Sequence, residues 1–294
     1  MGSDGGMKQN IADIVKQIHR LPTLPVVYAQ LERLIANPTT SARQLGVIVA
    51  EDQALATTIL KVVNSAFYGF SQAITSTERA VVLLGFNELK HIALSISVLN
   101  YFKNDIETDE FDMRSFWRHS LGVGVCARII AQKLGPHSGT NPEEAFTAGL
   151  IHDIGKLLAH QFMNKLFLEA IRICSWQKIT ISDAEKITLG FTHALLGEAL
   201  LVHWKLPPVL ARAVRYHNSP QIYTNGIAFS LVSLIHVADV FVRALEIGSG
   251  GDPFIPRLCI AAWHRLGLKP SHIKPILQET EKAYREMSGI MTLF

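Results

Sequence analysis

This 294-residue sequence has little of what usually identifies a secreted, membrane or nucleic-acid-binding protein. Its three cysteines are widely spaced and form no Cys-x-x-Cys pair, which argues against a disulfide framework or a thiolate metal site. Basic residues exceed acidic residues by only 28 to 25, and the resulting net charge of +3 is too small to indicate a nucleic-acid-binding surface. The most apolar run, residues 227–242, includes His236 and Asp239 and is shorter than the ~20 apolar residues of a membrane span. We therefore expect a cytoplasmic protein with free cysteines that binds neither nucleic acid nor membranes.

The beginning of the chain shows no signal peptide. Met1–Gly6 is typical of a vector-derived leader placed before a native Met7, and we exclude it from the interpretation. What the chain does contain is a large apolar fraction. Hydrophobic residues make up 48% of it and charged residues 18%, which indicates a well-packed core and excludes a disordered chain.

Apolar residues recur at helical spacing in nearly every segment. Ser41 with Gln44 and Thr75 with Glu78 form possible capping boxes at the starts of two helices. The segment Leu21–Pro25 contains two prolines, which end the helix before it. Because no segment alternates as a strand does, the sequence predicts an all-α protein.

The polar, acidic segment from Lys103 to Asp112 is the best candidate boundary between two helical parts. It divides the chain into an N-terminal helical bundle, residues 7–108, packed on a C-terminal helical bundle, residues 109–294. In the second part the apolar spacing predicts a long helix over Met113–Leu134 and another that starts near Asn141. Further helices are predicted over residues 162–176, 181–189, 193–204, 208–217 and 226–245.

The helix that starts near Asn141 carries the most informative motif of the chain. His152 is directly followed by Asp153, and Lys156 comes one turn later, all within an apolar helix. Such side chains are seldom placed there for packing alone. An adjacent His-Asp pair can offer one imidazole nitrogen and one carboxylate oxygen to a single metal ion. Gly149 and Gly155 leave room for another element to approach closely.

Other candidate ligands lie on different predicted helices: His119, His193, His217 and Asp239. Taken singly, an inward-facing histidine more often packs in a core than binds a metal. For Asp239, a helix cap or a buried salt bridge is an equally good interpretation, and His236 one turn before it is ambiguous. An unpaired aspartate in this apolar run would cost several kcal/mol, so Asp239 needs a partner or an ion. The joint pattern of His119, the His-Asp pair and Asp239 is far less expected by chance than any one member.

Together these residues resemble the metal-dependent phosphohydrolases of the HD superfamily, and the motif His-Asp-Ile-Gly-Lys is intact at residues 152–156. The N-terminal half is similar to the HDOD (HD-related output domain) family. The segments that carry this second resemblance are Leu21–Pro25, Asp52–Leu60, Val63–Tyr68, Ile74–Gly85, Phe116–Ser120 and Leu201–Pro207. The resemblance extends from about Ile11 to Asp239, which is most of the chain.

The resemblance implies that the C-terminal bundle is an HD-domain-like bundle that binds one or two divalent metal ions. His119 would be the first ligand, His152 and Asp153 the central pair, and Asp239 the last. A ligand set of nitrogen and oxygen alone suits iron, manganese, nickel or zinc, and the sequence does not choose among them.

Two further histidines bear on a second ion. His193 and His217 fall where the related HD-GYP phosphodiesterases place ligands for it. Asn218 stands where those enzymes have another histidine, and the Gly-Tyr-Pro signature is absent after His217. The resemblance therefore implies a site for one or two metals without implying a cyclic-dinucleotide substrate.

Three functions follow from the resemblance and stay open at this point. The first is a bacterial signal-transduction protein that binds a signalling protein partner or a phosphate-containing small ligand, with a structural or sensory metal. The second is an active metal-dependent phosphohydrolase, in which two ions clamp a phosphate. Its catalytic residues would be Asp153, which bridges the ions, and Lys156, which stabilises charge on the phosphoryl oxygens. The third is a helical scaffold with a vestigial site.

Overall fold

In the computed structural model, the residues whose placement is described are 26–102, 110–135, 139–223 and 228–288, and the regular structure within them is entirely helical. The prediction of an all-α fold is confirmed. The expected leader, the two prolines of Leu21–Pro25 and the expected boundary between residues 108 and 109 lie outside the described residues.

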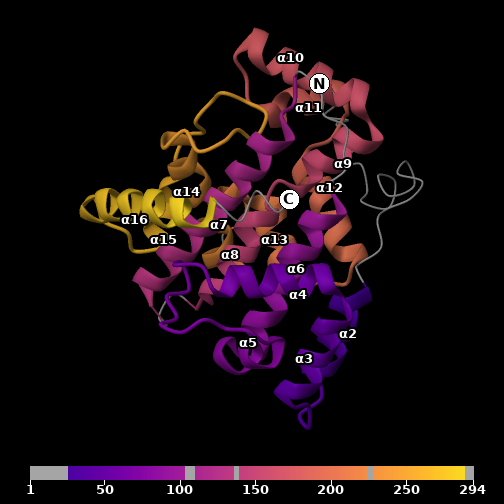
Figure 1. Cartoon of the computed structure of the whole chain (residues 1–294). Helices are drawn as coiled ribbons and strands as arrows, with labels where there is room; N and C mark the ends of the chain where they lie inside the picture. The colour runs from indigo at the N-terminus through magenta and orange to yellow at the C-terminus, as the bar shows by residue number, and fades with distance from the viewer. Residues whose placement is uncertain (1–25, 103–109, 136–138, 224–227, 289–294) are drawn as a thin grey trace.

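The helices of the N-terminal half gather in one part of the molecule, drawn in indigo to magenta in Figure 1. They are α2 (Val26–Ile35), α3 (Ala42–Glu51), α4 (Gln53–Val63), α5 (Thr77–Leu84) and α6 (Phe86–Tyr101). Ser41 and Gln44 form the predicted capping box of α3. The other predicted box is wrong by one residue, because Ser76, not Thr75, caps α5 by accepting a hydrogen bond from the backbone N–H of Arg79.

The helices of the C-terminal half include one of 22 residues, α7 (Met113–Leu134). The others are α8 (Pro142–Ile151), α9 (Ile154–Phe162), α10 (Asn164–Gln177), α11 (Ile181–Thr188), α12 (His193–His203), α13 (Pro208–Tyr216), α14 (Ala228–Ala244), α15 (Ile260–Arg265) and α16 (Pro270–Ser288), with a 3₁₀ turn at Pro220–Ile222. The bounds of α7 and of α10 to α14 agree with the predicted ranges to within two residues.

One predicted helix is broken in the structure. The helix expected to carry His152 and Asp153 ends at Ile151, and a new helix begins at Ile154. The turn directs Gly155 against α12, where an added Cβ would collide with the backbone carbonyl oxygen of His193 and lie 2.8 Å from the backbone nitrogen of Gly197. The His-Asp pair therefore lies at a junction of two helices rather than on the face of one.

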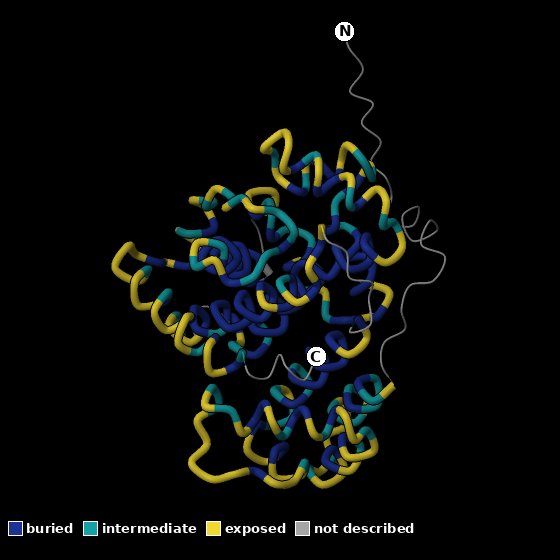
Figure 2. The backbone as a smooth tube through the Cα atoms, turned by 45° about the horizontal axis from the view of Figure 1, so that its top comes forward, coloured by how far each residue is buried: buried dark blue, intermediate teal, exposed yellow. Residues whose placement is uncertain are grey.

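Two clusters of buried apolar side chains form the core, and helix α6 contributes to both. Figure 2 marks the buried residues in dark blue along the backbone. Leu89, Ile92 and Ile96 belong to the smaller cluster among α2 to α6. Leu94 and Val98 belong to the larger cluster, which extends through α7 to α16. No single helix among the described residues is both long and apolar enough to cross a membrane, and the pair α5 and α6, which would qualify only together, bends by 119°.

A hydrogen bond and two cation–π contacts around an ion pair of α7 and α8 also join the two halves. Arg128 of α7 lies 2.6 Å from the buried Glu143 of α8, measured from Nε to Oε1. Tyr68, from the loop after α4, donates its hydroxyl to the other oxygen of Glu143 at 3.2 Å. The Arg128 guanidinium stands over the rings of Phe67 and Tyr68, 4.2 and 4.8 Å from their centroids. The loop of the N-terminal half is thus fixed to α7 and α8 together.

Candidate metal centre

The structure brings all six predicted ligand side chains together in the C-terminal half, although they come from different helices. They are His119 on α7, His152 and Asp153 between α8 and α9, His193 at the first turn of α12, His217 at the end of α13, and Asp239 on α14. Each is at most 2% exposed. Burial of six ionisable side chains in one place requires strong mutual compensation or a bound cation.

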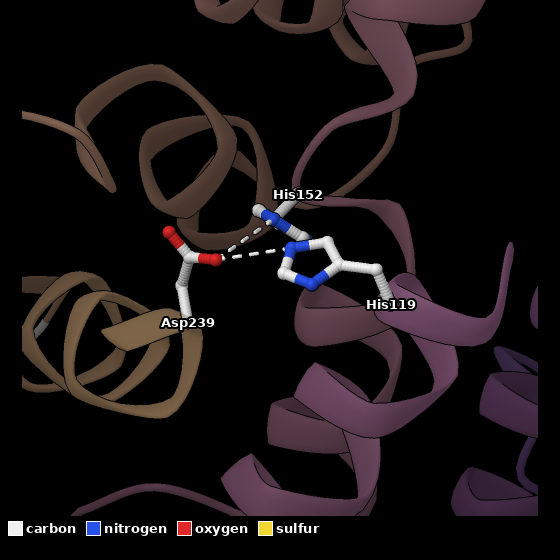
Figure 3. Close-up of side chains that lie close together, drawn as sticks. All are labelled: His119, His152 and Asp239. Atoms are coloured by element: carbon white, nitrogen blue, oxygen red, sulfur yellow. Dashed lines mark ion pairs between the residues drawn. The ribbon is translucent and has the colours of Figure 1, made fainter. Parts of the chain in front are cut away.

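His119, His152 and Asp239 form the first of two overlapping groups, shown in Figure 3. Oδ1 of Asp239 lies 3.0 Å from Nε2 of His119 and 4.0 Å from Nε2 of His152. One ligand atom from each residue falls within 4.8 Å of the other two, a spacing that one ion can span.

Asp153 is the centre of the second group, because its two oxygens face different histidines. Oδ2 lies 3.3 Å from Nε2 of His152. Oδ1 lies 3.1 Å from Nε2 of His193 and 3.4 Å from Nε2 of His217. His152, Asp153 and His217 could hold an ion as a second set of three. The carboxylate of Asp153 therefore contacts three of the four candidate histidines.

Three of the histidines are oriented by an oxygen behind the ring. Nδ1 of His152 lies 2.7 Å from the carbonyl oxygen of Gly149, and Nδ1 of His217 lies 2.8 Å from that of Val214. Nδ1 of His193 lies 2.7 Å from the buried carboxylate of Glu185. These contacts assign a proton to Nδ1 in each ring and turn Nε2 toward the centre, as in metal-binding histidines.

Two buried ring nitrogens of the centre, Nδ1 of His119 and Nε2 of His152, have no hydrogen-bond partner among the described residues. Buried polar atoms are nearly always paired, so an unpaired Nε2 that faces Asp153 and Asp239 fits a site that would hold a cation. The donors are imidazole nitrogens and carboxylate oxygens only, which fits iron, manganese, nickel or zinc.

The ionised state of the Asp153 and Asp239 carboxylates also favours binding of a cation. Burial alone would raise the pKa of Asp153, but His152 and Lys156 hold that pKa well below its usual range. Burial likewise opposes ionisation of Asp239, and Arg243 and His119 hold its pKa well below the usual range. Both side chains are therefore carboxylates at neutral pH.

The histidines differ in charge. Burial lowers the pKa of His217 to about 4 and also lowers the pKa of His119, so both rings are neutral. Burial acts in the same direction on His193, but Glu185 and Asp153 outweigh it and raise the pKa of His193 to about 9. In the absence of an ion, His193 thus supplies a positive charge beside Asp153.

Lys156, predicted as a catalytic residue, lies at the edge of the centre and is fully buried. Its Nζ donates to Oδ2 of Asp153 at 2.6 Å and to the carbonyl oxygen of Gly250 at 2.7 Å. Two of the three donors of this ammonium group are therefore engaged within the protein. His236, which was ambiguous in the sequence, has a structural role: its Nδ1 lies 2.8 Å from the carbonyl oxygen of His217, and its Nε2 accepts the backbone N–H of Cys259.

Three residues of the site were not predicted. Glu185 orients His193, and Asn218 places its amide nitrogen 3.0 Å from Nε2 of His193 and 2.7 Å from Nε2 of His217. Arg243 donates from Nε to Oδ1 of Asp239 at 2.9 Å. Arg243 had a local signal, because it follows Asp239 by one helical turn, where opposite charges meet. Asn218 had one only through the resemblance, because it stands where related enzymes have a histidine.

A cavity of about 590 Å³ adjoins the centre. Asn218 and Arg243 line it and also contact the candidate ligands, so these two side chains stand between the cavity and the buried centre.

The family model of the HDOD domain matches residues 21–220. A curated relative, an uncharacterized protein of Treponema pallidum (strain Nichols), is 25% identical over 252 residues, which are 84% of this chain and 46% of that protein. The chain thus spans less than half the length of this relative.

Solved structures share the fold. An HDOD domain protein with unknown function from Geobacter sulfurreducens aligns with a TM-score of 0.79 at 23% identity, over 97% of each chain. A protein named "Putative phosphohydrolase" from Shewanella amazonensis SB2B aligns with a TM-score of 0.68 at 21% identity, over 95% of this chain and 97% of that one. A protein named "Putative signal transduction protein" from Marinobacter aquaeolei VT8 aligns with a TM-score of 0.70 at 21% identity, over 97% of this chain and 62% of that one.

Proposed function

Because this chain belongs to the HDOD domain family, we propose that it is a bacterial signal-transduction domain that binds a divalent metal ion and acts by binding a protein partner or a small ligand rather than by turnover. The Marinobacter neighbour, whose name assigns it to signal transduction, agrees with this role. A metal-dependent phosphohydrolase is the second candidate.

His119, His152 and Asp239 would hold one ion, and Asp153 with His193 and His217 would be available to a second. A bound divalent ion would supply Lewis-acid chemistry and would neutralise the two buried carboxylates. The chain's own residues orient the ligands: Glu185, Gly149 and Val214 fix the rings from behind. This arrangement stabilises the packing of α7, α8, α12, α13 and α14 around one point.

The observation that carries the regulatory role is the enclosure of the centre. All six candidate ligands are buried, and Asn218 and Arg243 hydrogen-bond to them from the cavity side. Lys156 is engaged by Asp153 and Gly250 and does not line the cavity. A phosphoester in the cavity would therefore meet neither exposed ligand atoms nor a free ammonium group, which favours binding over hydrolysis.

The hydrolase is favoured by a different observation, namely the complete set of candidate ligands beside a cavity large enough for a small substrate. In that case Asp153 would bridge two ions and Lys156 would stabilise charge on the phosphoryl oxygens. The name of the Shewanella neighbour agrees with this second function.

Metal analysis joined to a hydrolysis screen separates the candidates. The full chain is purified anaerobically with added iron or manganese, its metal content is measured, and turnover is assayed with bis(p-nitrophenyl) phosphate and with cyclic dinucleotides. We expect bound metal without turnover. Turnover that is abolished in Asp153→Ala and kept in the surface variant Glu281→Ala would establish the hydrolase instead. A chain without bound metal would leave only a helical scaffold.

A further inference from the structure

The cavity beside the metal centre has a lining suited to an anion that carries an apolar group. Three cationic side chains face it, from Lys186, Arg243 and Arg257. Apolar walls come from Ile181, Phe254 and Leu258.

Two of the three cationic side chains form ion pairs within this lining, and the third does not. Asp183 and Asp252 also line the cavity, but they are paired with Lys186 at 2.9 Å and with Arg243 at 2.6 Å. Arg257 is exposed and forms no ion pair with any described residue. The net charge of the lining is therefore positive, which favours an anionic ligand.

Arg243 is a residue that belongs to both the cavity and the centre. Its Nε donates to Oδ1 of Asp239 at 2.9 Å, and its Nη1 donates to Oδ1 of Asp252 at 2.6 Å and to the carbonyl oxygen of Phe254 at 3.1 Å. Oδ1 of Asp239 is also the oxygen that lies 3.0 Å from Nε2 of His119. The guanidinium thus holds the oxygen that an ion between His119 and His152 would need.

A guanidinium and a divalent ion that share one carboxylate oxygen repel each other and compete for it. An anion in the cavity offers the guanidinium a replacement partner. Phosphate suits this role because its oxygens match the fork of an arginine and because its two charges can engage more than one of the three cations.

We propose that Arg243 is a positioning residue that couples the cavity to the metal centre: a phosphate-bearing small molecule in the cavity takes the Arg243 guanidinium from Asp239, so that ligand and metal strengthen each other's binding. This inference rests on the proposed metal-binding function and adds its regulation. No covalent step is involved.

The test is calorimetric titration of the metal-free full chain with Mn²⁺, in the presence and absence of phenylphosphonate, whose carbon–phosphorus bond resists hydrolysis. We expect phenylphosphonate to lower the Kd for Mn²⁺ by about fivefold or more, a typical size for coupled sites. By thermodynamic reciprocity, Mn²⁺ must lower the Kd for phenylphosphonate by the same factor. Benzoate, a carboxylate of similar shape, should couple less.

Arg243→Gln identifies the residue responsible. This variant should bind Mn²⁺ more tightly than the wild type without phenylphosphonate and should lose the coupling. Arg212→Gln is the matched control, because Arg212 pairs with the buried Glu198 at 2.8 Å and does not line the cavity. If Arg243→Gln does not fold, Arg243→Lys keeps the charge but loses the fork, and it should reduce the coupling.

The possible outcomes distinguish failure of the Arg243 coupling from failure of the proposed metal site. Equal coupling in the wild type and the Arg243 variant would show that phosphonate contacts the ion itself, and the inference would be overturned while the metal site stands. Binding of both ligands without coupling would overturn it as well, and so would coupling by benzoate that equals that by phenylphosphonate. If Mn²⁺ does not bind at all, the proposed function fails together with the inference.

Discussion

His193 and Glu185 form a buried pair at the back of the candidate metal centre, with Nδ1 of the imidazole 2.7 Å from Oε2 of the carboxylate. The same oxygen accepts the backbone N–H of His193 at 2.9 Å. One carboxylate thus fixes both the start of α12 and the direction in which the ring presents Nε2 to Asp153.

Replacement of Glu185 by alanine should lower both stability and metal affinity. Two buried donors of His193 would lose their acceptor, at a cost of about 1–3 kcal/mol in the free energy of unfolding. Loss of such an outer partner typically weakens metal binding by about 10–100-fold. Urea unfolding and Mn²⁺ titration measure the two effects, and Glu185→Gln, which keeps an acceptor oxygen, should show less of each. An alanine variant as stable as the wild type would contradict this role.

Asp239→Asn should remove most of the stabilisation that a metal gives. A ligand at 100 times its Kd stabilises the folded state by about 2.7 kcal/mol, and this term disappears with the site. Asparagine is preferred to alanine because its oxygen can still accept from Arg243, whereas removal of one partner of a buried ion pair costs about 3–5 kcal/mol by itself.

Melting temperatures with and without Mn²⁺ check this prediction. Asp252→Asn is the control, because it perturbs the same Arg243 without removing a candidate ligand, and it should retain a metal-dependent rise. An equal rise in Asp239→Asn and the wild type would show that Asp239 does not bind the ion.

Gly155→Ala should be strongly destabilising. Its Cβ would collide with the backbone of His193, and backbone atoms at the start of α12 have little freedom to move. Gly197→Ala is the matched comparison, because its new Cβ would meet chiefly a side-chain methyl group of Val214, which can shift. Thermal unfolding should place Gly155→Ala well below Gly197→Ala, and the reverse order would contradict the close contact of α9 with α12.

His91, on α6, should make stability depend on pH in the weakly acidic range. Burial, with a smaller effect of Lys90, lowers the pKa of His91 from 6.5 to about 4 in the folded protein. Between these values the unfolded chain binds the extra proton, so stability present above pH 6.5 is lost as the pH falls toward 4. Urea unfolding at pH 7 and pH 5 should show a smaller loss in His91→Gln than in the wild type. The exposed His264→Gln should behave as the wild type, and a His91→Gln variant with an undiminished loss would refute the assignment.

Much of the fold could be predicted because its signals are local. The apolar spacing and the caps at Ser41 and Asn141 mark helix bounds without reference to distant residues. The gathering of His119 and Asp239 with the His-Asp pair was also predictable, since polar side chains in apolar helices must find partners.

The unpredicted features depend on contacts between distant segments. The apolar pattern continues through residues 146–158, so nothing local announces the turn at Asp153, which follows the packing of Gly155 on α12. Glu185 looks like an ordinary polar residue of a short helix, and its role appears only in its contact with His193, eight residues later in the chain. Asn218 acquires a role only when His193 and His217 lie side by side.

Helix α6 also determines how the molecule unfolds. Its side chains are shared between the two core clusters, so the N-terminal bundle cannot separate without exposing Leu94 and Val98 of the larger one. We therefore expect the two halves to unfold as one cooperative unit, in a single transition whose temperature is the same for probes in either half. An ion bound at the centre would then raise the free energy of unfolding of α3 as well, although α3 carries no candidate ligand.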